Sequence, residues 1–318
     1  MKSIRITAVL IALAASVASA QTPTYFAVTS GAHPHDVAAT REAGGLVYYT
    51  AQMTGKLGIL DPATGKVEEI PLGRNSAPHG VIVGPDGAPW ITDGGQNAIV
   101  RVDPKTHAIT QWKLPASAPN ANLNTLTFDR HGKAWFTGQS GYYGRVDPAT
   151  GDVRVWRAPR GTGPYGITTT PSGDVYYASL AGSHIARIDV DTGEATVIEP
   201  PTPNQGARRV WSDSKGNVWV SYWNTGQVGR YDPATKTWRE WKLPGNAQTY
   251  SVWVDPADRV WLTDWSTNAI IRFDPATERF ESYPSDQRGA NVRQMLGRAG
   301  EAWGAESGTD RLVRIPTQ

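Results

Sequence analysis

Two histidines of this sequence occupy equivalent places in a repeat, and their chemistry is the first candidate for function. His35 and His79 each come directly after a proline. Two imidazoles beside a carboxylate such as Asp93 or Glu306 can hold a divalent metal ion, or one imidazole can act as a general base that a second group orients. The alternative is that both are hydrogen-bonded loop residues inherited from a Pro-His-Gly repeat. We take His79 and His35 as the candidate catalytic residues.

The repeat that carries these histidines predicts the fold. Each copy holds an aromatic anchor, followed about 13 residues later by an Asp-Pro turn, and contains four short segments of alternating apolar residues bounded by Gly, Pro and Asp. Four antiparallel strands repeated seven times at this period are typical of an all-β protein, a seven-bladed β-propeller of four-stranded blades. The anchors, spaced by 41 to 45 residues, are Tyr48, Trp90, Trp135, Tyr176, Trp219, Trp261 and Trp303.

The two ends of the chain predict how the ring closes. The last copy stops at residues 311–315 after only three strands, and residues 25–29 precede the first complete copy. We expect this N-terminal strand to complete the last blade, which leaves no open sheet edge where the ends meet. Residues 21–318 are therefore predicted to form a single domain.

Strand direction brings two positions of every copy to the same mouth of the central channel. The start of the first strand and the end of the second share one face because the chain reverses between them. Residue types at both positions differ from blade to blade, as a binding surface requires. The first ring is His35, His79, Asn124, Tyr165, Arg208, Tyr250 and Val292, with Arg293 next to the last, and the second ring is Ala51, Asp93, Gly138, Ser179, Tyr222, Asp264 and Glu306.

These rings supply the remaining candidates. The carboxylates predict metal contacts, and the amide, phenol and guanidinium groups predict substrate contacts. The predicted metal ligands are Asp93, Glu306 and Asp264, and the predicted substrate-binding residues are Asn124, Tyr165, Arg208, Tyr222, Tyr250 and Arg293.

The first twenty residues have the pattern of a secretory signal peptide. Lys2 and Arg5 precede an apolar run from Ile6 to Ala15, and small residues stand before Gln21. The run is shorter than the roughly 20 residues that cross a bilayer, so no membrane span is predicted. We expect a periplasmic or secreted protein.

Composition narrows the choice of partners. The chain has no cysteine, which excludes disulfides and thiolate metal sites. Removal of the predicted signal lowers the count of Lys and Arg from 31 to 29, equal to that of Asp and Glu, so nothing indicates nucleic-acid binding. We expect a monomer that binds a small molecule at the channel mouth.

The repeat motifs resemble those of the virginiamycin B lyase (streptogramin lyase) family. They are P-H-G-V-I-V-G-P-D-G-x-x-W-I-T from Pro78, W-F-T from Trp135 and G-R-V-D-P-A-T-G from Gly144. The resemblance covers the chain after residue 20 and implies a propeller that opens an ester of a cyclic depsipeptide by elimination, with Mg²⁺ and a histidine base.

The family's site pattern is only partly present. Its Pro-His motifs in the last two blades are replaced here by Tyr250 and Val292, and only its glutamate is retained, as Glu306. The Pro-His pair stands two blades further around the ring, and Asp93 takes the position that corresponds to the glutamate. Because a propeller is nearly rotationally symmetric, we expect that the site could be rebuilt there, although Ala77 offers no counterpart of a second glutamate.

Three functions stay open at this point. The first is a magnesium-dependent lyase of a cyclic or ester-containing small molecule, with His79 as base, His35 as second ligand or orienter, and Asp93 and Glu306 on the metal. The second is a lactonase resembling the SMP-30/gluconolactonase propellers, in which Asn124 and carboxylates including Asp264 bind a divalent metal. The third is a binding module without chemistry, whose mouth is lined by Tyr165, Tyr222, Trp223, Tyr250 and Trp265.

Overall fold

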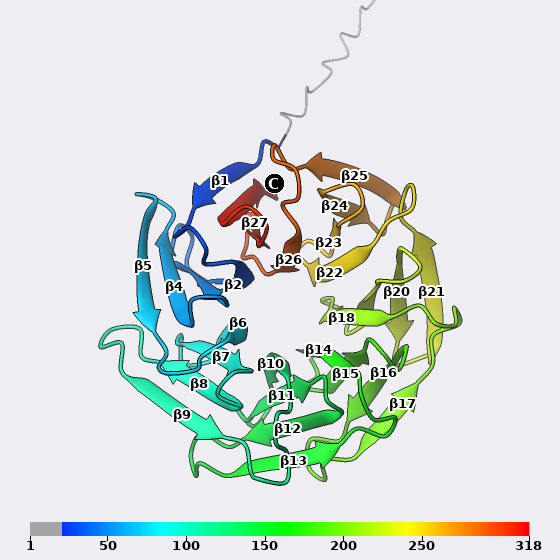
Figure 1. Ribbon diagram of the computed structural model, residues 1–318. Helices are drawn as coiled ribbons and strands as arrows, with labels where there is room; N and C mark the ends of the chain where they lie inside the picture. Colours follow the sequence, from blue (N-terminus) through cyan, green and yellow to red (C-terminus); the bar gives the residue numbers. More distant parts are fainter. Residues whose placement is uncertain (1–20, 318) are drawn as a thin grey trace, which may run out of the picture.

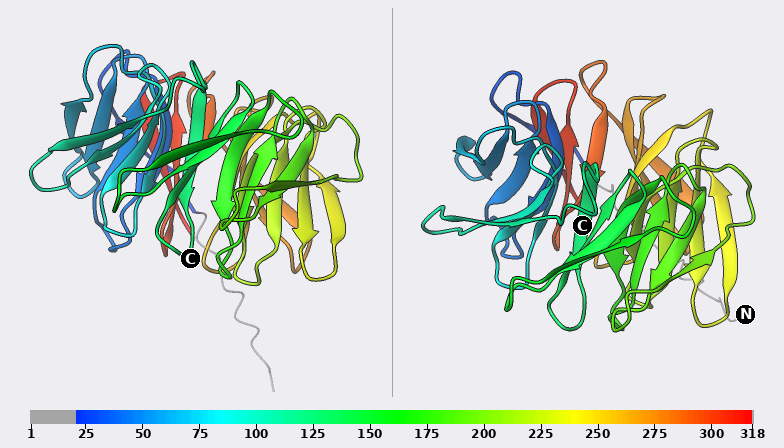
Figure 2. Two further views of the ribbon diagram at one scale, coloured as in Figure 1. Left: turned by 90° about the horizontal axis from the view of Figure 1, so that it is seen from below. Right: turned by 60° about the horizontal axis from the view of Figure 1, so that its bottom comes forward.

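A ring of seven four-stranded antiparallel sheets surrounds a central channel in the computed structural model (Figure 1). The structure describes residues 21–317, so the predicted signal peptide lies outside the described residues. Side views show the blades standing beside one another in a disc, with loops at both faces (Figure 2). The predicted seven-bladed propeller is confirmed. No helix among residues 21–317 is long and apolar enough to cross a membrane.

Blades 1 to 6 each use four consecutive strands, from the channel outward. Blades 1 to 3 are β2 (Pro34–Ala39), β3 (Val47–Ala51), β4 (Lys56–Asp61) and β5 (Lys66–Pro71); β6 (Pro78–Val83), β7 (Pro89–Asp93), β8 (Ala98–Val102) and β9 (Ile109–Lys113); and β10 (Leu123–Phe128), β11 (Ala134–Gly138), β12 (Tyr142–Val146) and β13 (Val153–Arg157). Blades 4 to 6 are β14 (Pro164–Thr169), β15 (Val175–Ser179), β16 (His184–Ile188) and β17 (Ala195–Ile198); β18 (Ala207–Ser212), β19 (Val218–Tyr222), β20 (Gln227–Asp232) and β21 (Thr237–Lys242); and β22 (Thr249–Val254), β23 (Val260–Asp264), β24 (Ala269–Asp274) and β25 (Arg279–Pro284).

The seventh blade joins the two ends of the chain. It consists of β26 (Val292–Met295), β27 (Glu301–Glu306), β28 (Arg311–Pro316) and, at its outer edge, β1 (Thr24–Ala27). β1 pairs antiparallel with β28, from Thr24 opposite Arg314 to Ala27 opposite Arg311. The expected closure of the ring by the N-terminal strand agrees with this pairing, which covers the edge that β28 would otherwise expose.

The aromatic anchors pack between neighbouring blades, and several of them are held by a carboxylate six residues earlier. Trp135, Trp219 and Trp261 are at most 1% exposed. Their indole N–H groups donate to Asp129 at 2.7 Å, Asp213 at 2.9 Å and Asp255 at 2.9 Å, respectively. A buried indole needs such an acceptor, so the aspartate in the first turn of the blade supports the core as well as the turn.

A β-bulge near the start of the innermost strand positions the channel residues. In β2 the register to β3 shifts between Pro34 and Val37, and corresponding shifts occur in the innermost strands of the other blades. At the bulge of β2, Thr50 Oγ1 accepts from the amide of Asp36 at 3.0 Å and donates to the carbonyl of His79 in the next blade at 2.8 Å. The bulge frees consecutive residues from regular alternation, and the hydroxyl ties each blade to its neighbour.

Similar hydroxyl contacts recur around the ring. Thr92 Oγ1 accepts from the amide of Gly80 and donates to the carbonyl of Asn124 at 2.6 Å, and Ser221 Oγ donates to the carbonyl of Tyr250 at 2.8 Å. The positions of the channel side chains are therefore set by backbone contacts that do not depend on which side chain stands there.

The aspartate that accepts from the anchor indole should be a stability determinant. Asp213→Ala removes the acceptor of Trp219 and of the backbone amides of Lys215 and Asn217, so we expect a loss of about 1–3 kcal/mol in the free energy of unfolding, measured by urea denaturation. The control Asp191→Ala removes a carboxylate that is 67% exposed and should change stability by less than about 0.5 kcal/mol. Equal effects of the two substitutions would contradict the assigned role.

Candidate functional site at the channel mouth

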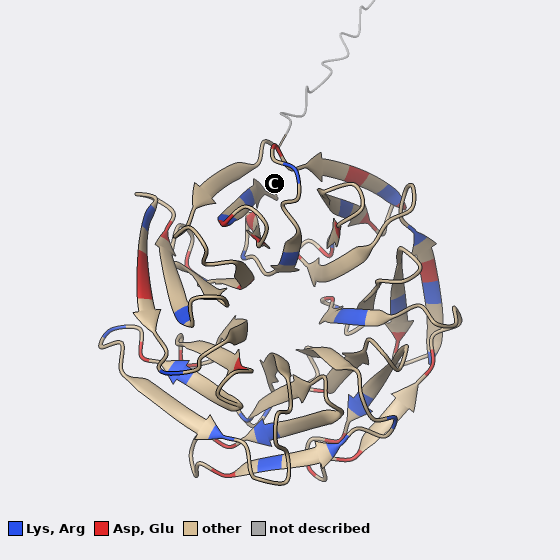
Figure 3. Ribbon diagram, viewed as in Figure 1, with Lys and Arg blue, Asp and Glu red and all other residues tan. Residues whose placement is uncertain are grey.

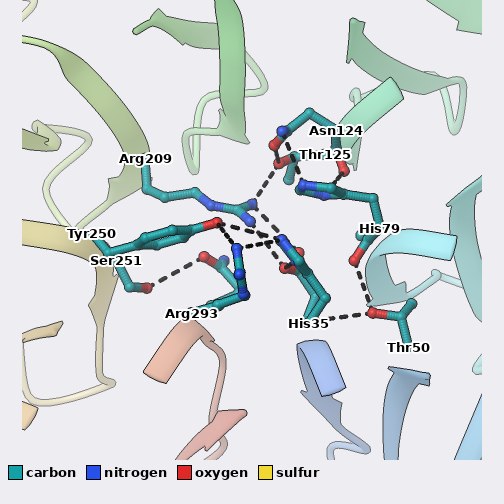
Figure 4. Close-up of polar contacts among 12 residues, drawn as sticks. His35, Thr50, His79, Asn124, Thr125, Arg209, Tyr250, Ser251 and Arg293 are labelled. Carbon is teal, nitrogen blue, oxygen red and sulfur yellow. Dashed lines mark hydrogen bonds and ion pairs between the residues drawn. The ribbon is translucent and has the colours of Figure 1, made fainter. Parts of the chain in front are cut away.

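The innermost strands bring the predicted first ring together at one mouth of the channel. Figure 4 shows side chains from different blades pointing toward one another, including His35, His79 and Tyr250. Tyr165 and Tyr250 share a hydrogen bond of 2.6 Å between their hydroxyls. The ring members that converge are His35, His79, Asn124, Tyr165, Arg208, Tyr250 and Arg293, and the last of these takes the place expected for Val292, which packs in the core between blades.

His35 is oriented by a carboxylate and faces a phenol. Its Nδ1 lies 2.8 Å from Asp36 Oδ1, which assigns the proton to Nδ1 and leaves the lone pair of Nε2 free. Nε2 lies 3.4 Å from the hydroxyl of Tyr250 and 3.3 Å from Nη1 of Arg293. Burial, and then the charge of Arg293, lower the pKa of His35 well below its ordinary value, so the imidazole is neutral at neutral pH.

Both ring nitrogens of His79 face Asn124. Nδ1 donates to the Asn124 carbonyl at 3.0 Å, and Nε2 accepts from the Asn124 side-chain amide at 3.2 Å. The rings of His79 and His35 lie 3.7 Å apart between centroids. Burial, and then the neighbouring His35, lower the pKa of His79 well below its ordinary value. The expected role of His79 as base is untested. In this arrangement the lone pair of its Nε2 accepts the hydrogen bond from the Asn124 amide.

A fully buried ion pair joins two blades across the channel. Arg209 donates from Nη2 to Asp36 Oδ1 at 2.9 Å and from Nη1 to Asp36 Oδ2 at 3.3 Å, and Nη1 also donates to Thr125 at 2.5 Å. Asp36 and Arg209 are each 1% exposed. Burial raises the pKa of Asp36, while Arg209 opposes that rise. Because Asp36 binds both Arg209 and His35, the pair fixes the orientation of the imidazole.

Tyr250 lies among three guanidinium groups. Their Cζ atoms lie 3.7 Å from its ring centroid for Arg208, 5.8 Å for Arg209 and 5.8 Å for Arg293. Burial raises the pKa of the Tyr250 phenol, but these positive charges outweigh burial and lower it to about 8. Tyr165, its hydrogen-bond partner, keeps its proton, because burial and then the phenolate beside it raise its pKa to about 12. The pair therefore loses its first proton near pH 8.

The predicted metal ligands Asp93, Asp264 and Glu306 are the last residues of β7, β23 and β27, and each is hydrogen-bonded within its own surroundings. Asp93 accepts from Ser76 and from the amides of Ala77 and Gln96. Asp264 accepts from the amide of Gln248 and from Ser266 and Thr267, and Glu306 pairs with Arg311 and accepts from Ser285 and Thr309. The structure does not bring these three acids together. Within residues 21–317, the group of side chains close enough to share one ion is His35, Asp36 and His79.

One predicted substrate contact also lies away from the mouth. The Tyr222 hydroxyl donates to Glu240 at 3.1 Å inside blade 5, so its side chain faces neighbouring strands rather than the channel. The other aromatic residues predicted for the mouth do cluster: Tyr250 stacks on Trp265 with centroids 5.0 Å apart, and Trp223 meets both edge to face.

Asp36 and Arg209 were missed by reasoning from the repeat, although a signal was present. They stand one residue after the first ring, where the other blades have Gly80, Thr125, Gly166, Ser251 and Gln294. Asp36 and Arg209 are therefore the charged members of that position. Opposite charges at one repeat position could have suggested a pair across the channel.

Removing one partner of the ion pair should lower the free energy of unfolding more than replacing both partners together. Asp36→Asn leaves Arg209 buried without its partner, so we expect a loss of about 3–5 kcal/mol in the free energy of unfolding. The double variant Asp36→Leu with Arg209→Met should lose less than the single variant, and Glu278→Gln, in an exposed pair with Arg239, should lose less than about 1 kcal/mol. Urea denaturation measures all three. A double variant less stable than Asp36→Asn would contradict this account.

The Tyr250 phenol should lose its proton at a lower pH than an ordinary tyrosine. Ultraviolet difference spectroscopy should detect one tyrosinate forming near pH 8 in the unmodified protein and none there in Tyr250→Phe. Arg293→Gln removes one of the charges that favour the phenolate and should move this titration upward, whereas Arg279→Gln, on the outer strand β25, should leave it unchanged. A first tyrosinate at the ordinary pH of about 10 in every variant would show that the arginines do not act on Tyr250.

Comparison with known proteins agrees with the geometry at the level of family and fold. The family model described as "Virginiamycin B lyase family" matches residues 4–249. Virginiamycin B lyase from Staphylococcus aureus superposes with a TM-score of 0.85 at 21% identity over 93% of this chain and 99% of that chain. A catalytically inactive variant of that enzyme with quinupristin gives 0.84 at 22% identity, over 93% of this chain and 99% of the other.

A shorter match connects part of the chain with a gluconolactonase. The gluconolactonase of Zymomonas mobilis subsp. mobilis is 30% identical over 139 residues, which is 43% of this chain and 32% of the length of that relative. The alignment thus spans about a third of the gluconolactonase. The match to the family model, by contrast, covers most of the chain. This protein belongs to the virginiamycin B lyase family.

Proposed function

We propose that this protein is a lyase that opens an ester of a small molecule by elimination at the channel mouth, with Tyr250 as the general base. The observation that supports this most directly is the lowered pKa of the Tyr250 phenol. Burial raises this pKa, but the charges of Arg208, Arg209 and Arg293 outweigh burial and lower it to about 8. A base with a pKa close to the working pH is suited to take a proton from carbon. His79 and His35, the bases expected first, are weaker bases than an ordinary histidine because burial lowers their pKa values.

The residues of the mouth do not fit the Mg²⁺ ion that the family resemblance implies. Magnesium prefers oxygen ligands in octahedral geometry. The group that could approach an ion offers two imidazoles and Asp36, whose oxygens are already bonded to Arg209 and His35. Arg208 and Arg293 add positive charge beside it. We therefore derive no step through a metal.

The proposed step needs only groups of this chain and the substrate. The Tyr250 phenolate takes the proton from the carbon next to the carbon that bears the ester oxygen. The electrons of that C–H bond form a C=C bond, the C–O bond breaks, and the ester leaves as a carboxylate, so no proton donor is needed. Tyr250 then returns its proton to solvent. Arg208 and Arg293 stabilise the negative charge that moves from the phenolate to the leaving group.

His35 acts as a positioning residue in this scheme. Its Nε2 accepts from Tyr250 while the phenol is protonated, and its Nδ1 is held by Asp36, so the imidazole positions the phenol before it becomes the base. The lactone-hydrolase alternative would need Asp93, Asp264 and Glu306 around one metal ion, and these acids bond to separate loops. We also propose that the protein acts outside the cytoplasm, as its first twenty residues suggest.

The test uses quinupristin, the compound with which the inactive staphylococcal variant was solved, together with a panel of cyclic esters and lactones. Ring opening by elimination leaves the mass unchanged and creates a C=C bond, whereas hydrolysis adds one water, so mass spectrometry separates the two reactions. We expect elimination of at least one ester and a rate that rises with pH to a plateau above about 8, because the phenolate is the active form.

Variants assign the roles. Tyr250→Phe should lower kcat/KM by about 100-fold or more, while Tyr231→Phe, which removes a tyrosine hydroxyl on β20 of blade 5, should leave it unchanged. His35→Gln should lower kcat and move the pH profile without abolishing turnover. Products heavier by one water would favour the lactonase, and the absence of turnover on the whole panel would favour a binding module without chemistry.

A further inference from the structure

Positive charge is concentrated on one side of the channel mouth. Figure 3 marks basic positions on the inner strands β18 and β26, which border the channel, and Figure 4 shows Arg209 and Arg293 beside Tyr250. Around the Tyr250 ring lie three guanidinium groups, and one of them, Arg209, is bound by the carboxylate of Asp36. Since the imidazoles there are neutral, the cluster carries an excess of positive charge.

Asp36 neutralises one guanidinium and leaves the other two without a carboxylate. It makes two hydrogen bonds to Arg209. Arg208 donates to the Tyr165 hydroxyl at 2.9 Å, and Arg293 donates to Ser307 at 2.9 Å. Among the ion pairs of the described residues, none joins Arg208 or Arg293 to an acid, and both side chains are partly exposed.

Arg208 has donor capacity that nothing in the described part of the chain uses. Its Nε is buried and has no hydrogen-bond partner, while its Cζ lies 4.5 Å from the ring centroid of Trp223 and 3.7 Å from that of Tyr250. The edge of a planar guanidinium matches the two oxygens of a carboxylate. A partly exposed guanidinium that lies beside two aromatic rings and has no carboxylate partner is suited to bind a planar anion.

Two partly exposed tryptophans extend the same surface. Trp223 and Trp265 meet edge to face, with centroids 5.4 Å apart and planes at 84°. The Arg293 guanidinium lies 5.1 Å from the Trp265 centroid. A flat ligand that carries an anionic group can therefore contact indole faces while its charge lies near both arginines.

We propose that the channel mouth binds a planar organic carboxylate between Arg208 and Arg293, with its ring system against Trp223 and Trp265. This rests on the proposed function in naming the substrate class of the enzyme, an ester that also carries a carboxylate. Pairing with the arginines neutralises the carboxylate, which makes the neighbouring C–H bond more acidic for Tyr250. The same positive charge opposes the binding of a divalent cation.

The test uses benzoate as the anion and benzamide as its neutral counterpart of the same shape, both measured by calorimetry at low ionic strength. We expect saturable benzoate binding that weakens with added salt and no comparable binding of benzamide. Arg208→Gln and Arg293→Gln should each weaken benzoate binding about tenfold or more. Arg208→Lys, which keeps the charge but not the planar fork, should weaken it less than Arg208→Gln.

Arg157→Gln is the matched control. Arg157 also stacks on an aromatic ring, Tyr142 at 4.2 Å, but it lies on the outer strand β13, so its removal should leave benzoate binding unchanged. Circular dichroism and thermal unfolding confirm that each variant is folded. Equal binding of benzoate and benzamide, unchanged affinity in both arginine variants, or saturable Mg²⁺ or Ca²⁺ binding lost in Asp36→Asn would overturn the inference.

This design separates the inference from the proposed function. Benzoate contains no C–O bond that elimination could break, so its binding does not depend on turnover. A protein that binds benzoate through the arginines but opens no ester supports the anion site and refutes the lyase. A protein that opens neutral esters and ignores benzoate refutes the anion site alone.

Discussion

The buried ion pair between Asp36 and Arg209 is the constraint around which the channel mouth is arranged. Two charges at 1% exposure persist only when they are paired and hydrogen-bonded, and these two residues belong to blades 1 and 5 on different sides of the ring. The pair therefore connects two blades that are not neighbours in the ring. It also orients His35, because Asp36 accepts from the imidazole and from the guanidinium with the same oxygen, Oδ1.

The positive charge of the guanidinium groups at the mouth determines which side chain there can act as a base. Arg208 and Arg293 add two guanidinium groups that Asp36 cannot neutralise, and Tyr250 lies against both. A phenol is the group that gains most from such surroundings, since its ionised form is stabilised while the neutral imidazoles of His35 and His79 are kept from protonation. The same feature that disfavours a metal ion thus favours a tyrosine base and an anionic ligand.

Different residue types can stand at equivalent positions of the channel mouth because the strand framework of the propeller does not depend on the side chains there. Hydroxyls of residues such as Thr50, Thr92 and Ser221 bind backbone groups of their own and of the next blade, and the bulge they support recurs around the ring. Tyr250 can therefore occupy a place where relatives are expected to carry histidine, and Glu306 can serve Arg311 in the last blade, without any change in the fold.

The sequence by itself determined the seven blades, the closure of the ring and most members of the first ring, because anchors, turns and strand direction repeat with a period that any copy displays. In the last blade the expected Val292 packs in the core, and Arg293 takes its place in the ring. The sequence also placed Arg208, Tyr165 and Tyr250 at one mouth.

Only the tertiary structure decided which of these groups interact. Asp93, Asp264 and Glu306 share the repeat position at which metal ligands were predicted, yet nearby amides and hydroxyls satisfy them. Asp36 meets Arg209 from the other side of the channel. A repeat position sets the depth and radius of a side chain, whereas its partner depends on the bulge and on distances across the ring, which no local pattern records.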